Sequence, residues 1–434
     1  MKDQILEAEI SSLSHDGRGV ARVDGKVFFI EDALPGERVR FRRGRRKRSY
    51  ETGRSIEVLR PCADRVDPPC EYFGTCGGCA LQHYSERAQI ASKQAQLSEN
   101  LSKIAKSRPE TWLDALIGPV WHYRRKARLG IRLVPKKGGI LIGFRERGKS
   151  YITSLQHCRV LDRKISDLLP CLHDLVGGLS CPDRIPQIEV AAGENAISLV
   201  FRHLVDLSLQ DRADMSRFAQ RHGVQVYLQP GGLETIHPLS PETPVTLRYS
   251  LPDHDVWIGF EPVDFVQVNA GLNSMLVELA LTCLELDPTD SVLDLFCGLG
   301  NFTLPIARRA ARVQGVEGEL TLVQRARVNA GDNALENVQF AMADLYSETP
   351  GGAWLDQRYD KILLDPPRTG AMEVVKVLNQ LDPHRVVYIS CNPATLARDA
   401  EVMIHKHGFI LTKAGVIDMF PHTNHVESIA VFDR

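Results

Sequence analysis

The run VLDLFCGLGNFTLPIA, residues 292–307, joins an apolar strand-like segment to a helical one through a glycine-rich turn. Downstream, short apolar runs keep alternating with helical stretches, in the order RVQGVEG, VQFAMAD, KILLDPP, VVYISCN and ESIAVFD. Strands that are separated by helices pair in parallel, and helices then cover both faces of the sheet. We therefore predict a doubly wound parallel α/β sheet over residues 261–434.

The glycine turn and the ends of the next strands predict a crevice that binds a nucleoside. Gly298 and Gly300 let a ligand approach the backbone, but Thr303 stands where a dinucleotide fingerprint has its third glycine. Glu317 ends the next strand, where a carboxylate can bind both hydroxyls of a ribose. Two further acids end the following strands: Asp344 and Asp365. The pattern favours an S-adenosylmethionine-dependent methyltransferase over its alternative, an NAD-dependent oxidoreductase.

A cysteine at the end of the strand VVYISCN decides which atom is methylated. Methyltransferases of exocyclic amines often have an aromatic residue after their [N/D]PP sequence, whereas this chain has Arg368 there. Carbon 5 of a pyrimidine is a poor nucleophile until a thiolate adds to carbon 6 and generates an enolate. Cys391 is the candidate thiolate, and Glu427 is the candidate base for the hydrogen on carbon 5. His422 and His425 lie near Glu427 in sequence, but without an H-E-x-x-H arrangement they do not favour a metal site.

Two regions precede the predicted sheet. Residues 1–60 alternate in short strand-like runs separated by the turns DGRG, VDGK and ALPGE, which is typical of a small antiparallel barrel. The proline-rich segment RPCADRVDPPC marks a boundary near residue 61. Residues 61–260 contain a predicted helix over 87–104 and then mostly strand-like runs, so we expect a mixed α+β domain there.

The net charge of −1 hides a strong segregation of charge along the chain. The segment RVRFRRGRRKR, residues 38–48, contains no acid, and residues 121–149 are also densely basic. Such runs favour a polyanion partner. A base in structured RNA must be flipped out to reach a crevice. Two aromatic residues followed by four basic ones are predicted to contact RNA: Trp121, Tyr123, Arg124, Arg125, Lys126 and Arg128. The two aromatic rings could equally pack in the core. Alanine at Arg124 and Arg125 should then weaken RNA binding and spare cofactor binding.

Three cysteines are gathered in PPCEYFGTCGGCALQH: Cys70, Cys76 and Cys79. In a reducing cytosol, thiols at this C-x5-C-x2-C spacing are candidate metal ligands. A fourth ligand is needed, and Cys62 is the candidate nearest in sequence. The spacing by itself accepts either zinc or an iron–sulfur cluster.

Taken together, these motifs resemble those of bacterial RNA uracil-C5 methyltransferases. The motifs that carry the resemblance are PPCEYFGTCGGCALQH, YRRKARL, DFVQVNAG, LDLFCGLGNFTLP, GVEG, LLDPPR, YISCNPATLARD and DMFPHTNHVES, so it covers essentially the whole chain. Within that family the chain is most similar to the branch that methylates a specific uridine of 23S rRNA. That branch has an N-terminal TRAM domain, which is an RNA-binding barrel, and a [4Fe–4S] cluster. A dual-site relative that also has a TRAM domain is the alternative.

The resemblance implies a role for individual residues. Cys391 would be the nucleophile and Glu427 the base. Six positions would bind S-adenosylmethionine: Gln267, Phe296, Asn301, Glu317, Asp344 and Asp365. Cys158 would complete a [4Fe–4S] site with Cys70, Cys76 and Cys79.

Two other classes of protein fit the sequence less well. A non-catalytic iron–sulfur RNA-binding regulator would leave the nucleophile and the glycine turn without a role. A radical S-adenosylmethionine enzyme usually has C-x3-C-x2-C, which differs from the spacing here. No apolar run is long enough for a transmembrane helix, and the N-terminus is not of signal-peptide type, so a cytoplasmic location is expected. Nothing in the sequence indicates a membrane or an obligatory protein partner.

Overall fold

The computed structural model describes residues 4–240 and 244–434, and the chain forms two compact units. The first contains the N-terminal segment up to Gln96 together with Arg145–Tyr151 and Phe420–His425. The second contains Leu97–Phe144, Ile152–Met419 and Val426–Arg434. The division into domains at 1–60, 61–260 and 261–434 stays a prediction, and two short segments of the later chain belong to the first unit.

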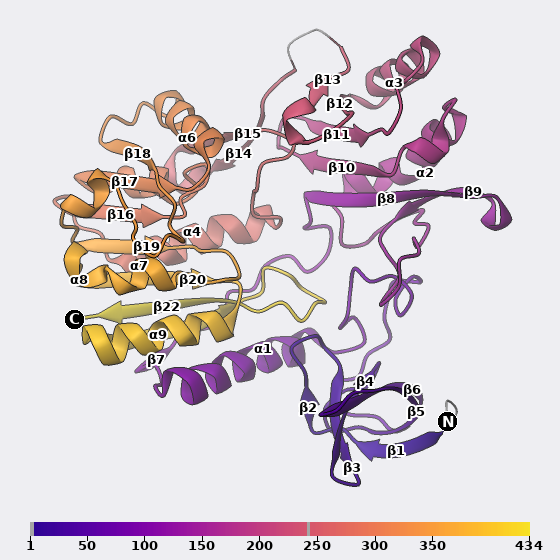
Figure 1. Ribbon diagram of the computed structural model, residues 1–434, viewed down its shortest axis with the longest axis horizontal. Helices are drawn as coiled ribbons and strands as arrows, with labels where there is room; N and C mark the ends of the chain where they lie inside the picture. The colour runs from indigo at the N-terminus through magenta and orange to yellow at the C-terminus, as the bar shows by residue number, and fades with distance from the viewer. Residues whose placement is uncertain (1–3, 241–243) are drawn as a thin grey trace. The chain divides into compact units, whose positions relative to one another are not determined.

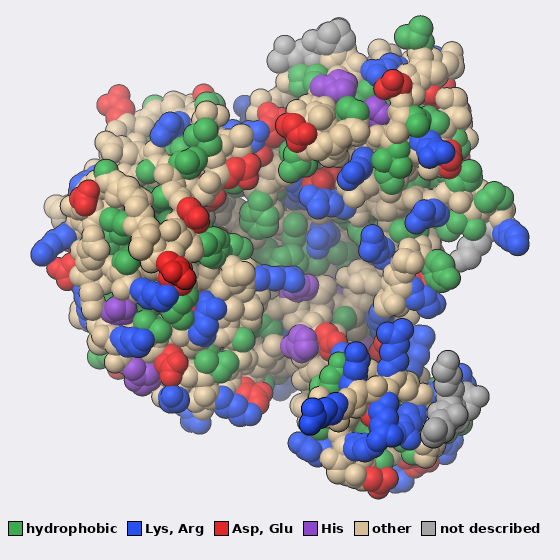
Figure 2. All heavy atoms as spheres, viewed as in Figure 1, with side chains coloured by type: hydrophobic (Ala, Val, Ile, Leu, Met, Phe, Trp, Pro, Cys, Tyr) green, Lys and Arg blue, Asp and Glu red, His purple; other side chains and the backbone are tan. Residues whose placement is uncertain are grey.

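The N-terminal part of the first unit is a six-stranded sheet with the order β1-β5-β6-β4-β3-β2 (Figure 1). Its strands are β1 (Ile5–Glu9), β2 (Ser12–Leu13), β3 (Gly19–Val23), β4 (Lys26–Glu31), β5 (Arg38–Arg46) and β6 (Tyr50–Arg60). Alternate residues of the strands point inward and share one core, which includes Ile30, Val39 and Phe41. The intervening residues of β5 are arginines, and Figure 2 shows Lys and Arg side chains gathered over these strands.

The second unit contains a mixed sheet with the order β13-β12-β11-β10-β8-β9. Its strands are β8 (Lys126–Val134), β9 (Gly139–Gly143), β10 (Gln187–Ala192), β11 (Ile197–Arg202), β12 (Val224–Gln229) and β13 (His237–Pro238). Two helices accompany it, α2 (Arg163–Gly178) and α3 (Leu209–His222), and a hairpin follows, β14 (Leu247–Leu251) with β15 (Val256–Phe260). A capping box between Ser208 and Asp211 begins α3, and Gly223 ends it in the left-handed conformation. The α+β character expected for this region is therefore present.

An eight-stranded sheet with the order β18-β17-β16-β19-β20-β22-β21-β7 completes the second unit (Figure 1). Its strands are β16 (Ser291–Leu295), β17 (Arg312–Glu317), β18 (Val338–Met342), β19 (Lys361–Leu364), β20 (Arg385–Ser390), β21 (Ile410–Ile417), β22 (Glu427–Asp433) and the short β7 (Thr111–Trp112). The first five run parallel, and β22 is antiparallel to both β20 and β21. The predicted doubly wound sheet is confirmed, with one antiparallel strand in addition.

Helices surround this sheet: α4 (Ala270–Leu284), α5 (Thr303–Ala307), α6 (Leu320–Asp332), α7 (Met372–Lys376), α8 (Leu378–Leu381) and α9 (Pro393–His407). The strands between them are almost wholly buried apolar residues, as both-face coverage requires. The helix predicted at 87–104 is α1 (Glu86–Asn100), which continues as a π-helical turn over Leu101–Ala105. Among the helices in the described part of the chain, none has the length and apolarity needed to cross a membrane.

Candidate active site

Cys391 lies in the turn between β20 and α9. Asn392 caps α9 because its side-chain oxygen accepts a hydrogen bond from the Ala394 N–H at 3.1 Å, and Pro393 occupies the first helical position. The same segment is held from the strand side, since the Ser390 hydroxyl accepts from the Asn392 N–H at 3.1 Å. The sequence S-C-N-P therefore fixes the thiol at the carboxyl edge of the sheet, where the predicted crevice opens.

Glu427 is the first residue of β22, the strand that pairs with β20. The antiparallel register ends with Ser390 paired with Ser428, and Cys391 and Glu427 are the neighbours of these two residues in sequence. The Glu427 carboxylate is also close enough to raise the pKa of the Cys391 thiol. Glu427 is buried, with 5% of its surface exposed. The structure therefore brings together the two residues that were predicted to be nucleophile and base.

The Cys391 thiol is held in its protonated form. Burial and the carboxylates of Glu427 and Asp365 raise its pKa to about 11, while Arg368 opposes them. Cys297, in the glycine turn, is fully buried, and burial raises its pKa well above the usual value. Cys391 is the more accessible of the two and has a cation near it, which makes it the better nucleophile.

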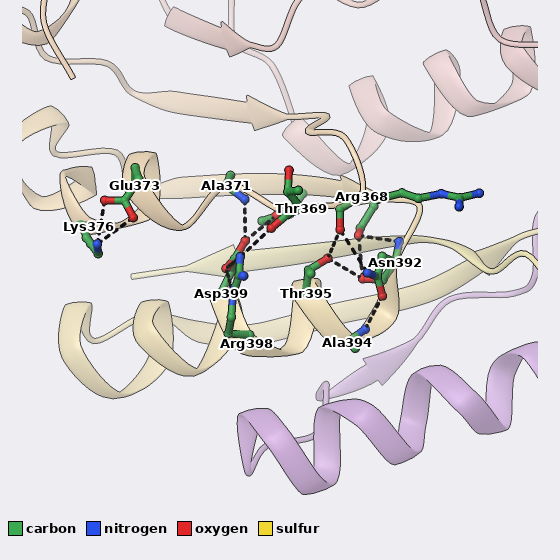
Figure 3. Close-up of polar contacts among 12 residues, drawn as sticks. Arg368, Thr369, Ala371, Glu373, Lys376, Asn392, Ala394, Thr395, Arg398 and Asp399 are labelled. Atoms are coloured by element: carbon green, nitrogen blue, oxygen red, sulfur yellow. Dashed lines mark hydrogen bonds and ion pairs between the residues drawn. The ribbon is translucent and has the colours of Figure 1, made fainter. Parts of the chain in front are cut away.

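The loop after β19 is tied to the start of α9 (Figure 3). The carbonyl of Arg368 accepts from Asn392 Nδ2 at 3.1 Å and from Thr395 Oγ1 at 3.2 Å. The carbonyl of Thr369 accepts from Arg398 at 2.9 Å, and the Ala371 N–H donates to buried Asp399 at 2.7 Å. These bonds join the DPPRTG segment to the SCNPATLARD segment and thereby hold Arg368 beside the nucleophile.

The glycine turn after β16 has the geometry of a ligand-binding loop. Gly298 and Gly300 have φ of 54° and 92°, and Phe296 also has a positive φ of 64°. The Gly298 N–H donates to the Glu317 carboxylate at 3.1 Å, which ties the turn to the end of β17. In β16, just before the turn, burial raises the pKa of Asp294 to about 8, and its carboxyl group accepts from the Thr303 hydroxyl at 2.5 Å.

The next two acids also lie at this edge of the sheet. Asp344 is exposed after β18 and accepts from the Tyr346 N–H at 2.9 Å. The Tyr346 ring lies 5.7 Å from that of Phe296, and its hydroxyl accepts from Thr369 at 3.0 Å. Burial raises the pKa of Asp365, after β19, to about 7. Tyr346 was not predicted, because no recognisable motif contains it.

Gln267 and Asn301 are joined to the central sheet by one arginine. Gln267, before α4, is buried, and its carbonyl accepts from Arg125 Nε at 2.8 Å. Asn301 Oδ1 accepts from the Tyr249 hydroxyl at 2.8 Å, and the Arg125 guanidinium lies over that tyrosine ring at 4.2 Å. Asn273, on α4, completes the group by exchanging side-chain hydrogen bonds with Asn301.

The prediction that Arg125 contacts RNA is therefore wrong, because only 5% of its surface is exposed. A signal in the sequence could have shown this. Arg125 is in phase with Ala127, Leu129 and Ile131, which form the buried face of β8, whereas Arg128 is out of phase with them.

The other predicted RNA contacts differ in exposure. Tyr123 is 6% exposed and belongs to the core, whereas Trp121 and Arg124 are half-buried. Lys126 and Arg128 both pair with Glu189, but the Arg128 side chain remains 65% exposed. Arg128 is thus the best placed of the basic residues on this strand to contact a phosphate.

The cysteine cluster forms a tight loop in the first unit. The Phe73 N–H donates to the Cys70 carbonyl at 3.0 Å, and the Gly78 N–H donates to the Cys76 sulfur at 3.4 Å. Arg147 donates to the Cys79 carbonyl at 3.0 Å and to Asp32 at 2.7 Å. In residues 4–240 and 244–434, no three His, Cys, Asp or Glu side chains are grouped so that they could hold a metal ion.

The remaining predicted residues are placed as follows. Cys158 belongs to the second unit, where its N–H donates to Ser166 Oγ at 2.9 Å. His422 belongs to the first unit, and its carbonyl accepts from the N–H groups of Ala80 and Leu81 at 2.9 Å. The His425 ring packs 5.3 Å from Phe420.

The family described as tRNA (Uracil-5-)-methyltransferase matches residues 85–434. The chain belongs to this family. A TRAM domain matches residues 1–42, which confirms the predicted identity of the N-terminal barrel. Membership of a methyltransferase family also favours a methyltransferase over a non-catalytic iron–sulfur regulator and over a radical S-adenosylmethionine enzyme.

Bacterial members of the family match nearly the whole chain. The 23S rRNA (uracil(1939)-C(5))-methyltransferase RlmD of Aromatoleum aromaticum is 51% identical over 98% of this chain and 99% of its own. The protein of the same name from Methylococcus capsulatus is 47% identical over 99% of this chain and 97% of its own.

A solved structure shows the same fold. It is that of the Pyrococcus abyssi tRNA (uracil-54, C5)-methyltransferase in complex with S-adenosyl-L-homocysteine, which is 22% identical. It aligns with a TM-score of 0.76 over 98% of this chain and 100% of that chain. The second unit therefore has the class I methyltransferase fold that was expected for the C-terminal region.

The raised pKa of Cys391 predicts how this family member reacts with an alkylating reagent. Only the thiolate reacts, so the rate at Cys391 should rise about tenfold per pH unit between pH 7 and 9.5. Mass spectrometry of the tryptic peptide that contains Cys391, after brief treatment with iodoacetamide, measures this rate separately from the other cysteines. A rate that levels off below pH 9 would contradict the prediction.

Proposed function

We propose that this protein transfers the methyl group of S-adenosylmethionine to carbon 5 of uridine 1939 in 23S rRNA. Relatives of that name share about half of their residues with it over nearly its full length. The observation that carries the proposal is that the register of β20 with β22 brings Cys391 and Glu427 to the same end of the sheet as the glycine turn, where Glu427 raises the pKa of Cys391. A thiol and a carboxylate so placed suit addition to one face of a pyrimidine and removal of a proton from its carbon 5.

The reaction follows from these two side chains. The Cys391 thiolate adds to carbon 6 of the flipped uracil, and the electron pair of the 5,6 double bond moves into an enolate. Carbon 5 of the enolate then bonds to the methyl group that S-adenosylmethionine supplies, the bond from that methyl group to the sulfonium breaks, and S-adenosylhomocysteine leaves. Glu427 then accepts the proton from carbon 5, the double bond re-forms, and the thiolate leaves carbon 6. Arg368 stabilises the thiolate before addition and after elimination, since it is the cation that favours ionisation of Cys391.

We assign the cofactor to the crevice beside the nucleophile. Glu317 would bind the ribose, Asp344 the adenine, and Phe296 the face of the nucleoside. Gln267 and Asn301 would hold the amino-acid end, and Asp365 would lie between that end and the uracil. The positive φ of both glycines supports this, because a turn of glycines without side chains lets a ligand approach the backbone closely.

The target nucleotide can be tested directly. Ribosomal RNA from a strain that lacks the gene should accept labelled methyl from S-adenosylmethionine when it is incubated with the purified protein, and digestion should locate the label at uridine 1939. Label at two uridines would support the dual-site alternative instead. No label in 23S rRNA would contradict the proposal.

RNA binding is assigned to the TRAM barrel and to the exposed basic residues of the central sheet. The arginines of β5 that face away from the barrel core support this, since phosphate contacts dominate the affinity of such domains. Because ribosomal RNA is the substrate, we place the protein in the cytoplasm.

We also propose that Cys70, Cys76, Cys79 and Cys158 hold a [4Fe–4S] cluster, on the strength of their spacing and of the resemblance. The N–H donated by Gly78 to the Cys76 sulfur supports a thiolate there, because such bonds are common around cluster ligands. The described side chains are not grouped for a metal, so no step of the reaction is assigned to the cluster.

Iron content tests the cluster and its fourth ligand. Protein purified without oxygen should be brown and contain about four iron atoms per chain. Cys158→Ala should lose that iron, whereas Cys62→Ala, in the proline-rich linker, should keep it. Colourless protein with stoichiometric zinc would contradict the proposal, as would a Cys158→Ala variant that keeps its iron.

A further inference from the structure

Arg125 is a buried cation on which two proposed cofactor residues depend. Its backbone joins two strands to the segment before α4, since the Arg125 N–H donates to Val268 at 3.0 Å and its carbonyl accepts from Ala192 at 2.8 Å. Its Nε donates to the Gln267 carbonyl at 2.8 Å. Its guanidinium covers the ring of Tyr249, whose hydroxyl donates to Asn301. The Arg125 side chain therefore supports Gln267 through its backbone carbonyl and Asn301 through Tyr249.

One nitrogen of this guanidinium has no partner. Within residues 4–240 and 244–434, Arg125 Nη2 is buried and makes no hydrogen bond. Burial lowers the pKa of Arg125, which expresses the cost of keeping its charge away from water. Tyr249 and then Glu194 oppose this shift, but the Glu194 carboxylate already accepts from the N–H and the hydroxyl of Ser250. A buried guanidinium that lacks a hydrogen-bonded carboxylate is expected to acquire an anion from a ligand.

The position of Arg125 indicates which end of the ligand it meets. Asn301 follows Gly300 directly in the glycine turn, whereas Glu317 ends the next strand, where the ribose is expected. The amino-acid end of S-adenosylmethionine therefore lies on the side of Asn301, Gln267 and Arg125. Its carboxylate is the only anionic group of that molecule, because the nucleoside is neutral and the sulfonium and ammonium groups are positive.

We propose that Arg125 binds the carboxylate of S-adenosylmethionine through its free Nη2 and holds Gln267 and Asn301 in place around the amino-acid end. This inference rests on the proposed function for the identity of the ligand. Arg125 thereby becomes a cofactor-binding residue that lies just before β8, outside the eight-stranded sheet.

Two ligands that differ only in the amino-acid end provide the test. S-adenosylhomocysteine contains the carboxylate, and 5′-methylthioadenosine lacks it. A charged hydrogen bond contributes about 1.5–3 kcal/mol, so Arg125→Met should weaken S-adenosylhomocysteine binding by about 10- to 150-fold, and 5′-methylthioadenosine by less than about threefold. Calorimetry on the full-length protein measures both. Arg217→Met, a matched change at an exposed arginine of α3, should alter neither affinity.

Arg125→Lys serves as a second variant in case methionine prevents folding. It keeps the charge but loses the planar fork, so its loss of S-adenosylhomocysteine affinity should be smaller and again absent for 5′-methylthioadenosine. Equal losses for both ligands would overturn the proposal and leave Arg125 a purely structural role. Unchanged binding of both ligands with weakened RNA binding would also overturn it. A wild-type protein that binds no S-adenosylhomocysteine would instead contradict the proposed function.

Discussion

Replacement of Cys391 by alanine is expected to abolish methyl transfer, with a loss of at least about 10⁴-fold, because no other group can raise the nucleophilicity of carbon 5. The side chain lies at the end of β20 opposite Glu427, and its removal leaves the sheet and the glycine turn intact. S-adenosylhomocysteine should therefore bind to the variant with unchanged affinity. Transfer of labelled methyl to unmodified 23S rRNA measures the first effect, and calorimetry measures the second.

A matched control separates the loss of this thiol from the loss of any thiol. Cys171 is half-buried on α2, away from the wound sheet, and Cys171→Ala should methylate RNA at the wild-type rate. RNA that contains 5-fluorouridine should form a denaturation-resistant adduct with the wild-type protein but not with Cys391→Ala. The fluorine on carbon 5 cannot be removed by a base as a proton is, so the cysteine stays bonded to carbon 6. Substantial methyl transfer by Cys391→Ala would overturn the covalent mechanism.

Replacement of Glu427 by glutamine is expected to stop the reaction after methyl transfer. The amide is close to the carboxylate in size but cannot accept the proton from carbon 5, so turnover should fall by about 10²- to 10⁴-fold. The methylated uracil should then remain bonded to Cys391. A labelled protein–RNA band on a denaturing gel, which contains methyl from S-adenosylmethionine, measures this intermediate.

Two further variants make this outcome specific. The double variant with Cys391→Ala should show no such band, because the thiol forms the bond. Glu401→Gln changes a half-buried glutamate of α9 that pairs with Lys106, and it should retain wild-type turnover. Normal turnover by Glu427→Gln would assign the base to another group. An adduct without the labelled methyl would show that Glu427 acts before methyl transfer.

Much of the fold could be predicted because the signals are local. The strand-turn-helix run at 292–307 corresponds to β16, the glycine turn and α5, and the run KARLGIRLV coincides with β8, Lys126–Val134. Alternation of apolar residues and the place of glycine depend on neighbours in sequence, so they can be recognised without the tertiary structure. Cys391 and Asp365 follow from the same logic, since each ends a strand of a parallel sheet.

Strand order is a different matter, since it depends on packing between distant segments. The apolar run at 427–433 is recognisable as a strand, but the sequence does not show that this strand lies antiparallel between β20 and β21. That position is what sets Glu427 opposite Cys391. Arg125 shows the same limit, because its basic neighbours suggested RNA while the buried face of β8 requires it to point inward.

The sequence by itself therefore determined the class of fold, the family and the residues able to do the chemistry, because glycine turns, strand ends and reactive side chains are properties of short segments. Only the tertiary structure decided which of these residues meet. The register of β20 with β22 brings the proposed nucleophile near the proposed base, and the packing of the residues before β8 against the segment before α4 turns an apparent RNA contact into a buried cation beside Gln267. Both depend on the burial of apolar faces that belong to segments far apart in the chain.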